Sequence, residues 1–359
     1  MRAHQRYFKS VKSVWELVTE VALRPHLQHS VNDTKLFSPI VTMLYSSILL
    51  VASALATVAS QQLVLSGPPT GNRAYSLEWS ERTFLLNVPQ SYVHGESHPL
   101  VFSFHGAGGY SEKQQRITEL SDPSLRINGK PFLTIYAQGV NNSDWNMTHI
   151  WKGAPYENKT VDDIQYVFDA LEIVSKTYTV DRSRVYACGK SNGGGFTALL
   201  ACRPDTSAIF AAFAPVSPAL YQGTYAFHNC TPSRPVPIFH IHGVEDVITP
   251  FHGRTPEGGS FGPEPDVRLW RRQWTDMNGC KGRYEGEWAE PKLEEIHKGV
   301  WEETWDCPGA EVKAMTVEGL GHAWPSTLGL DLAGRPNQTA NFNLTNPYLV
   351  SFFSRHSLP

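Results

Sequence analysis

The sequence predicts an α/β fold with a mostly parallel central sheet and helices on both faces. Apolar, strand-like runs alternate with helical stretches from residue 82 onward, and this alternation is typical of parallel sheets covered on both sides. Hydrophobic residues make up 41% of the 359 residues, and aromatic residues 11%, which provides a sizeable core and excludes a disordered chain. The net charge of −3 gives no basic excess, so we expect no nucleic-acid partner.

Short apolar runs predict the strands, and longer periodic segments predict the helices. The strands are expected at residues 82–89, 100–105, 132–138, 184–188, 209–216, 237–242 and 312–317. The helices are expected at 162–179, 193–202, 267–278 and 346–356, with Thr160 or Asp162 as a cap for the first. Because ligands of parallel sheets bind at the carboxyl ends of the strands, we look for the chemistry in the segments that follow them.

The first sixty residues precede the domain that we expect at residues 61–359. Residues 43–60 are apolar and uncharged and end in small residues, which is typical of a signal peptide cleaved near Ala59 or Ser60. Residues 1–42 are interpreted as an upstream, disordered extension. A signal anchor is an alternative, because residues 40–60 nearly reach the roughly 20 apolar residues that span a bilayer; a buried helix is another. We expect a secreted, extracellular protein without stable membrane association after cleavage.

Glycosylation sequons also favour export. From residue 61 on, Asn-x-Ser/Thr begins at Asn141, Asn146, Asn158, Asn229, Asn337 and Asn343. This number exceeds the roughly two expected by chance at ordinary Ser and Thr usage. The excess predicts a glycosylated surface.

Five cysteines are compatible with an oxidising compartment. Cys280 and Cys307 flank a polar, Glu-rich segment and are expected to pair. Cys202, at a helix end, and Cys230, in a loop, can form a second bridge. Cys188 then remains as a buried, inert thiol.

A strand, a sharp turn and a helix surround a candidate nucleophile. The turn contains Gly189-x-Ser191-x-Gly193, in which small residues allow the strand and the helix to approach closely. This motif places Ser191 at the amino end of a helix, where backbone N–H groups favour developing negative charge. The alternative is a structural glycine-rich turn.

A glycine-rich loop follows the strand at 100–105 and reads His-Gly-Ala-Gly-Gly from residue 105. Loops of this type donate a backbone N–H to an oxyanion. The expected donors are the N–H groups of Asn192 and Ala107, and His105 is expected to orient the loop. A plain glycine-rich turn is the alternative.

The acid and the base of a triad should follow the serine in the order Ser, Asp or Glu, His. Asp246 lies just past the strand 237–242, with Glu245 as the alternative acid. His322 lies on a Gly- and Pro-flanked loop past the last strand, and His252 is its main competitor among 14 histidines. His240 and His242 share one face of a strand, a pattern that also occurs in metal sites. No third histidine lies at short spacing, so we expect no metal and no other cofactor.

The motifs together resemble fungal feruloyl esterases of carbohydrate esterase family 1, relatives of polyhydroxybutyrate depolymerases and some acetylxylan esterases. The resemblance extends from residue 76 to residue 358. It rests on the runs Gly-Lys-Ser-Asn-Gly-Gly-Gly-Phe from Gly189, His-Gly-Ala-Gly-Gly from His105, His-Gly-x-x-Asp from His242 and Gly-His-Ala-Trp-Pro from Gly321. It implies an α/β-hydrolase fold and a serine esterase mechanism through Ser191, Asp246 and His322.

The implied substrates are esters of plant cell-wall polysaccharides, with ferulic acid as the released acid. Trp151 and Trp324 are candidates for stacking on an aromatic acid or a sugar ring, with core packing as the alternative role for each. Other functions stay open: an acetylxylan esterase, a polyhydroxybutyrate depolymerase, or a secreted binding protein without catalysis.

Overall fold

The computed structural model describes residues 68–77, 81–221, 229–255, 261–282, 287–331 and 336–359. The predicted signal peptide at 43–60 and the extension at 1–42 lie outside the described residues. Gly67–Pro359 forms one compact unit. Within the described ranges, no helix is both long enough and apolar enough to cross a lipid bilayer.

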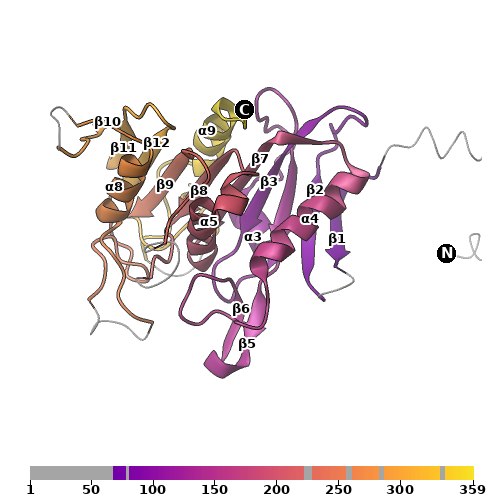
Figure 1. Cartoon of the computed structure of the whole chain (residues 1–359), viewed down its shortest axis with the longest axis horizontal. Coiled ribbons are helices and arrows are strands. Elements are labelled where there is room, and N and C mark those ends of the chain that lie inside the picture. Colours follow the sequence, from indigo (N-terminus) through magenta and orange to yellow (C-terminus); the bar gives the residue numbers. More distant parts are fainter. Residues whose placement is uncertain (1–67, 78–80, 222–228, 256–260, 283–286, 332–335) are drawn as a thin grey trace, which may run out of the picture. The chain divides into compact units, whose positions relative to one another are not determined.

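A ten-stranded sheet has the strand order β1-β2-β4-β3-β7-β8-β9-β12-β11-β10 (Figure 1). Its central strands are parallel neighbours: β4 (Leu133–Ala137), β3 (His98–Phe104), β7 (Val180–Lys190), β8 (Ala212–Val216), β9 (Ile238–Gly243) and β12 (Val312–Val317). Its outer strands pair antiparallel: β1 (Gly71–Ser76), β2 (Thr83–Val88), β11 (Val300–Trp305) and β10 (Lys292–His297). The mostly parallel sheet that the sequence predicts is confirmed.

Helices cover both faces of this sheet, as predicted. One buried cluster joins the sheet to α4 (Asp163–Thr177), α5 (Asn192–Cys202) and α8 (Val267–Met277). Figure 1 shows α4 and α5 in front of the strands. A second cluster joins the sheet to α3 (Ser111–Thr118) and α9 (Val350–Arg355). Smaller elements are η2 (Ser143–Trp145), α6 (Pro204–Ser207), η4 (Leu344–Leu349) and the strand pair β5 (Val140–Asn142) and β6 (Met147–Ile150).

The predicted elements are present, with shifted ends. The strand expected at 184–188 is longer, because β7 begins at Val180, before the fully buried part of the strand. The helix expected at 346–356 is present as the end of η4 followed directly by α9, and Asn346, the residue before Pro347, has non-helical backbone angles. Asp162 rather than Thr160 caps α4: its Oδ1 accepts hydrogen bonds from the N–H groups of Ile164 and Gln165.

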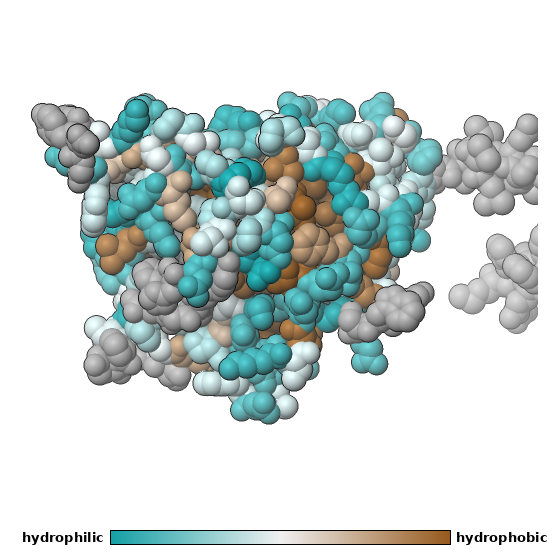
Figure 2. Space-filling view, viewed as in Figure 1, coloured by the Kyte–Doolittle hydropathy of each residue, from teal (hydrophilic) through white to brown (hydrophobic). Residues whose placement is uncertain are grey.

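The face drawn in Figure 2 is mostly hydrophilic. Hydrophobic side chains reach the surface mainly around α4, to the right of the centre. Phe168 and Ile173 of this helix are only partly buried and pack against the core from its outer side. The apolar surface here therefore continues the core.

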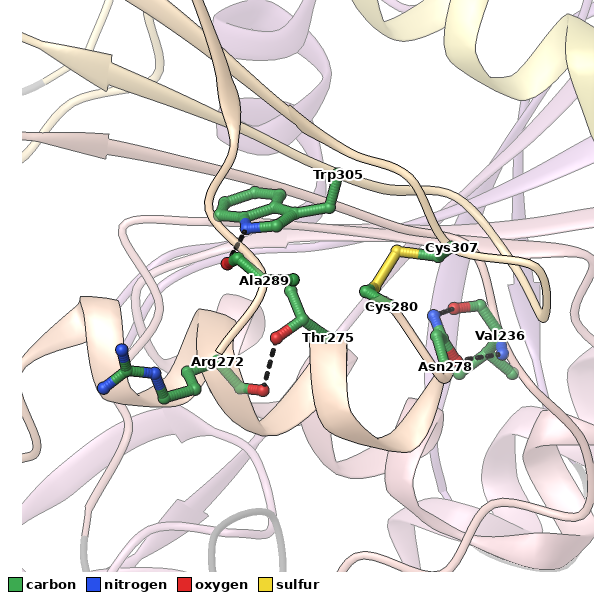
Figure 3. The surroundings of a disulfide bond; sticks show 8 residues. All are labelled: Val236, Arg272, Thr275, Asn278, Cys280, Ala289, Trp305 and Cys307. Carbon is green, nitrogen blue, oxygen red and sulfur yellow. Dashed lines mark hydrogen bonds between the residues drawn. A yellow bond between two sulfur atoms is a disulfide. The ribbon is translucent and has the colours of Figure 1, made fainter. Parts of the chain in front are cut away.

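Both expected disulfides are present, and Cys188 is a buried free cysteine. Cys202–Cys230 joins the end of α5 to a following loop. Cys280–Cys307 joins the segment after α8 to the segment after β11 (Figure 3). Near the second bridge, Asn278 holds Val236 through two hydrogen bonds, and Trp305 Nε1 donates to the carbonyl oxygen of Ala289. This bridge therefore fastens α8 to the antiparallel edge of the sheet.

Candidate active site

Ser191 occupies the turn between β7 and α5. Its φ of 59° and ψ of −124° are strained for a residue with a side chain, as expected at a nucleophile turn. A Cβ atom at Gly193 would collide with the backbone carbonyl groups of Phe104 and His105, so only glycine allows α5 to approach the end of β3 this closely. The close approach brings the first turn of α5 beside the loop that follows β3.

The loop after β3 lies directly against the serine. A Cβ atom at Gly106 would be 3.0 Å from Ser191 Cβ. His105 fixes this loop: its Nε2 accepts a hydrogen bond from the N–H of Gly139 at 3.0 Å, which leaves the proton on Nδ1. Nδ1 then donates to the carbonyl oxygen of Gly106 at 2.8 Å. His105 has the orienting position that the sequence predicts, and burial lowers its pKa to about 4.

Asn192 and Ala107, the predicted oxyanion donors, flank the serine from these two segments. Asn192 is the first residue of α5, and Ala107 lines the same cavity as Ser191. The Asn192 side chain is directed elsewhere: its Oδ1 accepts a hydrogen bond from the N–H of Trp151 at 2.7 Å. Trp151 Nε1 in turn donates to the carbonyl oxygen of His105 at 2.9 Å. Trp151 therefore connects the two segments around Ser191.

The acid and the base that the sequence predicts are in direct contact. His322 Nδ1 lies 2.7 Å from Asp246 Oδ2, although the two residues are 76 positions apart. Because a carboxylate only accepts hydrogen bonds, Nδ1 carries the proton and Nε2 is left unprotonated. The alternative residues are elsewhere: Glu245 is exposed, and the exposed His252 lies 3.7 Å from Asp266.

Several donors hold the Asp246 carboxylate. Its Oδ1 accepts hydrogen bonds from the N–H groups of Ile248 and Thr249, each at 2.9 Å, and its Oδ2 accepts one from Thr249 Oγ1 at 3.0 Å. Burial would raise the pKa of Asp246, but hydrogen bonds from His242 and His322 outweigh it and keep that pKa well below its ordinary value. Asp246 is therefore a fixed negative charge behind His322.

Burial also determines the protonation state of His322. It lowers the pKa of His322 to about 4, and the positive charge of Lys190 adds to the effect, while Asp246 opposes it. The imidazole is therefore neutral at pH 5 and above, the form that can accept a proton.

The His240–His242 pair belongs to a hydrogen-bond chain behind Asp246. Arg271 Nε donates to His240 Nδ1 at 3.0 Å, so the neutral His240 carries its proton on Nε2. This Nε2 lies 3.3 Å from His242 Nδ1, and His242 Nε2 lies 2.7 Å from the carbonyl oxygen of Thr249. His242 Nε2 also lies 3.5 Å from Asp246 Oδ2. The two imidazoles thus connect Asp246 to the buried Arg271 through hydrogen bonds.

A buried ion pair joins the serine turn to the histidine loop. Lys190 Nζ lies 2.7 Å from Asp331 Oδ2, and these side chains are 6% and 2% exposed. Asp331 Oδ2 also accepts a hydrogen bond from the N–H of Trp324 at 3.2 Å, two residues beyond His322. The pair therefore fixes the loop that carries His322 against the residue before Ser191.

Ser191 and His322 open on one cavity of about 430 Å³. This volume lies within the range of about 300–1,000 Å³ that is common for ligand pockets. Three aromatic side chains, Tyr156, Tyr221 and Phe261, line it together with Met147 and Ala219. Val247 and Ile248 also line it and are 81% and 41% exposed, so they form an apolar rim.

The prediction that Trp151 and Trp324 contact substrate is wrong in this structure. Their exposures are 0% and 2%, and neither is among the residues that line the cavity. Trp151 stacks on Phe196 of α5, and Trp324 Nε1 donates to Thr345 Oγ1. Both indole rings fill the core beside the site, where their N–H groups find acceptors, so they support the loops instead of the ligand.

The sequons lie at the surface. Exposed asparagines begin five of them: Asn141, Asn146, Asn229, Asn337 and Asn343. Asn158 is half-buried, and its Nδ2, the atom that would carry a glycan, donates to the carbonyl oxygen of Asn141. Glycosylation remains a prediction at all six positions.

Sequence reasoning missed the residues that shape the cavity. Tyr156, Tyr221 and Glu264 come from loops without a recognisable motif, and Asp331 is distant in the chain from its partner Lys190. The one available signal was Lys190, a charged residue between a buried strand and a buried helix, which requires a counter-ion.

The fold is that of an α/β-hydrolase, and the predicted nucleophile, acid and base follow the carboxyl ends of the parallel strands β7, β9 and β12. No family profile matches the chain. In sequence, it is similar to feruloyl and acetylxylan esterases. It is 24% identical to feruloyl esterase B of Piromyces equi over 245 residues, which are 67% of this chain and 42% of that protein. It is 26% identical to a bifunctional acetylxylan esterase/xylanase of Neocallimastix patriciarum over 228 residues, which are 63% of this chain and 29% of that protein.

The match therefore spans less than half the length of either of these two relatives. Among solved structures, an acetyl xylan esterase from Aspergillus awamori is similar, with a TM-score of 0.50, 14% identity, and coverage of 70% of this chain and 94% of that one. At this identity the similarity concerns the fold. The predicted resemblance to feruloyl and acetylxylan esterases is confirmed.

Proposed function

We propose that the chain is a secreted serine carboxylic-ester hydrolase that releases ferulic acid from plant cell-wall polysaccharide. The observation that carries this proposal is the cavity on which both Ser191 and His322 open, with Asp246 2.7 Å behind the imidazole. The similarity to feruloyl and acetylxylan esterases supports the same reaction class.

The first half of the reaction forms an acyl-enzyme. His322 Nε2 accepts the proton of the Ser191 hydroxyl as Oγ attacks the ester carbonyl carbon. Asp246 holds the imidazole in the required tautomer and stabilises its charged form. The N–H groups of Asn192 and Ala107 are the proposed donors to the oxyanion, and one such donor typically contributes about 10²–10³-fold in rate.

The second half regenerates the enzyme. The alcohol leaves with the proton that His322 holds, and the carbonyl becomes an acyl group on Ser191. Water then gives a proton to His322 as its oxygen attacks the acyl carbon. The carboxylic acid departs when Ser191 Oγ recovers the proton.

The walls of the cavity favour an aromatic acyl group. Tyr156 and Phe261 have ring centroids 4.8 Å apart, and Tyr156 and Tyr221 have centroids 5.8 Å apart. Such a group of rings offers faces and edges for stacking on a planar acid. An acetyl group would leave most of the cavity of about 430 Å³ unfilled.

Acetylxylan hydrolysis is the second candidate, because a bifunctional acetylxylan esterase/xylanase is among the relatives. Depolymerisation of polyhydroxybutyrate by the same triad, and binding without catalysis, are the remaining alternatives. We also infer that the mature enzyme corresponds to residues 61–359, exported by the segment 43–60 and glycosylated at its sequons. The two disulfides are compatible with such an oxidising destination.

A hydrolysis panel tests the function. Purified protein is assayed with methyl ferulate, acetylated xylan and polyhydroxybutyrate, and we expect the highest kcat/KM with methyl ferulate. Ser191→Ala should abolish hydrolysis, because it removes the attacking oxygen, whereas Ser124→Ala at an exposed position should leave it unchanged.

A second pair of variants tests the acid. Asp246→Asn should lower kcat by about 10⁴-fold, because an amide favours the wrong tautomer of His322. Glu245→Gln, its exposed neighbour, is the matched control and should have wild-type kcat. Undiminished hydrolysis by Ser191→Ala would refute the proposed nucleophile, and preference for acetylated xylan would select the second candidate.

A further inference from the structure

A buried carboxyl group lines the same cavity as Ser191 and has no role in the mechanism. Glu264 is 6% exposed. Its backbone N–H and carbonyl groups pair with those of Arg254 at 3.0 and 2.8 Å. Its carboxyl group makes no hydrogen bond or ion pair with the side chains and backbone that the structure describes. Its oxygens are not among the enclosed polar atoms that lack a partner, so they are accessible from the cavity, where a ligand group can supply the partner.

The charge state of Glu264 suits a hydroxyl group. Burial raises the pKa of Glu264 to about 7, with the negative charge of Asp246 adding to the effect and Arg254 opposing it. Below this pH the carboxyl group can donate a hydrogen bond, and above it the carboxylate only accepts. A hydroxyl group both donates and accepts, so it can pair with either form.

Aromatic rings line the same cavity as this carboxyl group. Burial raises the pKa of Tyr221 to about 12 and that of Tyr156 above its ordinary value, and the Glu264 charge contributes to both shifts. The carboxyl group therefore lies within electrostatic range of both phenol groups. Phe261 contacts both rings, with centroids 4.8 Å from Tyr156 and 6.3 Å from Tyr221.

A second polar atom of the cavity wall also has no partner. Arg254 lines the cavity, and its Nε is buried without a hydrogen bond within the described part of the chain. Its terminal nitrogen is engaged, since it donates to the carbonyl oxygen of Ile248 at 2.6 Å. Because Arg254 Nε is enclosed, the polar group that the wall offers at this point is the Glu264 carboxyl group.

We propose that Glu264, with Tyr156, Tyr221 and Phe261 around it, binds the ring hydroxyl of a 4-hydroxycinnamoyl group while Ser191 attacks its ester. This inference rests on the proposed function and assigns Glu264 as the residue that distinguishes hydroxylated from unsubstituted cinnamoyl esters. A sugar hydroxyl of the alcohol could also pair with a carboxylate. The ring-lined surroundings of Glu264 favour the planar acid over the sugar.

The test compares two substrates that differ by one hydroxyl group. The kcat/KM values for methyl 4-hydroxycinnamate and methyl cinnamate are measured with the wild type, Glu264→Leu and Glu264→Gln. We expect the wild type to prefer the hydroxylated ester. Glu264→Leu should lower kcat/KM for that ester by about 10–100-fold, as for loss of a hydrogen bond to a charged group, and change methyl cinnamate by less than about threefold.

Glu264→Gln should have an intermediate preference, because its amide still forms hydrogen bonds. Glu294→Gln on the exposed strand β10 is the matched control and should have wild-type values for both esters. A ratio of the two kcat/KM values that stays at the wild-type level in Glu264→Leu would overturn the proposal. Equal loss with both esters would assign Glu264 a structural role and overturn it as well.

A further arm separates the acid from the alcohol. The loss in Glu264→Leu should be the same for methyl ferulate and for a ferulate ester of arabinose; a loss confined to the arabinose ester would place the sugar at Glu264 and contradict the proposal. If the wild type hydrolyses only acetyl esters, the proposed function is refuted by the wild-type assay alone, independently of the Glu264 variants.

Binding to an inactive enzyme covers the case in which the leucine variant does not fold. In Ser191→Ala protein, 4-hydroxycinnamic acid should bind more tightly than cinnamic acid, as measured by calorimetry. With Tyr156→Phe added, the inactive enzyme should still bind 4-hydroxycinnamic acid more tightly than cinnamic acid. With Glu264→Gln added, the difference between the two affinities should become smaller. Equal affinity of the inactive enzyme for the two acids would refute the subsite.

Discussion

At the scale of single residues, the site depends on imidazoles whose protons are placed by their neighbours. His322 Nδ1 is paired with Asp246, His105 Nδ1 with Gly106, and His240 is fixed by Arg271. Burial keeps the pKa of His105 and His322 at about 4. These rings are therefore neutral hydrogen-bonding groups over most of the pH range, each with one defined tautomer.

The pH dependence of the reaction follows from His322. In the proposed reaction only the neutral ring accepts the serine proton, and the pKa of His322 is lowered from about 6.5 to about 4. We expect kcat/KM to be constant from pH 8 down to about pH 5 and then to fall about tenfold per pH unit below pH 4. A rate profile with an acid midpoint near 6.5 would contradict this expectation. The assay should use a hydroxyl-free ester, so that Glu264 does not contribute.

At the scale of elements, the serine turn and the histidine loop are held together by the Lys190–Asp331 pair. The last residue of β7 provides the cation, and the loop beyond β12 provides the anion. Because both side chains are buried, removing one partner leaves an uncompensated charge. The geometry of the proposed triad is thus coupled to the packing of two distant segments.

Lys190→Met tests this coupling. Loss of the cation should lower the free energy of unfolding by about 3–5 kcal/mol, as for other broken buried pairs. It also removes a positive charge that lowers the pKa of His322, so the acid limb of kcat/KM should move to higher pH. Chemical denaturation and pH-rate profiles measure the two effects. Lys190→Arg should restore most of the free energy of unfolding and most of the wild-type acid limb. An unchanged acid limb in Lys190→Met would refute the effect of the Lys190 charge on the pKa of His322.

The sequence predicted the elements whose side chains are buried and missed those whose side chains are polar. The central strands were recognised because they are continuous apolar runs. The strands β1 and β10 have mostly exposed side chains, and α3 reads Ser-Glu-Lys-Gln-Gln-Arg-Ile-Thr, so none of them has an apolar pattern. The charged edge strand β10 pairs with β11 through backbone hydrogen bonds, which the side-chain pattern does not predict.

In the candidate site, too, some residues could be predicted from the sequence and others could not. Ser191, Asp246 and His322 stand in short motifs at strand ends, and the structure brings the acid and the base together as those motifs predict. Glu264 and Tyr221 reach the cavity through loops whose course depends on tertiary packing. For Trp151 and Trp324 the sequence left substrate contact and core packing open, because an indole next to a motif has the same sequence signature in both cases, and the structure buries both rings.

At the scale of the whole molecule, the disulfides fasten the outer parts to the central sheet. Cys280 and Cys307 are separated by 27 residues and join α8 to the edge formed by β11 and β10. Bridges that close loops of this size typically stabilise a domain by about 2–4 kcal/mol. They contribute to stability from positions outside the residues that line the cavity.

The double variant Cys280→Ser/Cys307→Ser tests this contribution. We expect the free energy of unfolding to fall by about 2–4 kcal/mol and Tm to fall with it, while kcat/KM at 25 °C stays within about twofold of the wild type. Thermal unfolding and the ester assay measure both. Cys188→Ala retains both bridges and serves as the comparison; a large loss of activity in the double variant at 25 °C would show that the bridge also shapes the site.

The charged strand at the end of the sheet has a consequence for how copies of the protein behave at high concentration. A terminal strand has free backbone groups that can pair with another molecule and start aggregation. In β10 the exposed side chains include Lys292, Glu294 and Glu295. An approaching copy would have to strip water from these charged groups before its backbone could pair with β10. This border of the sheet therefore resists edge-to-edge pairing, so copies of the protein are expected to stay apart at concentrations where a bare apolar edge would join them.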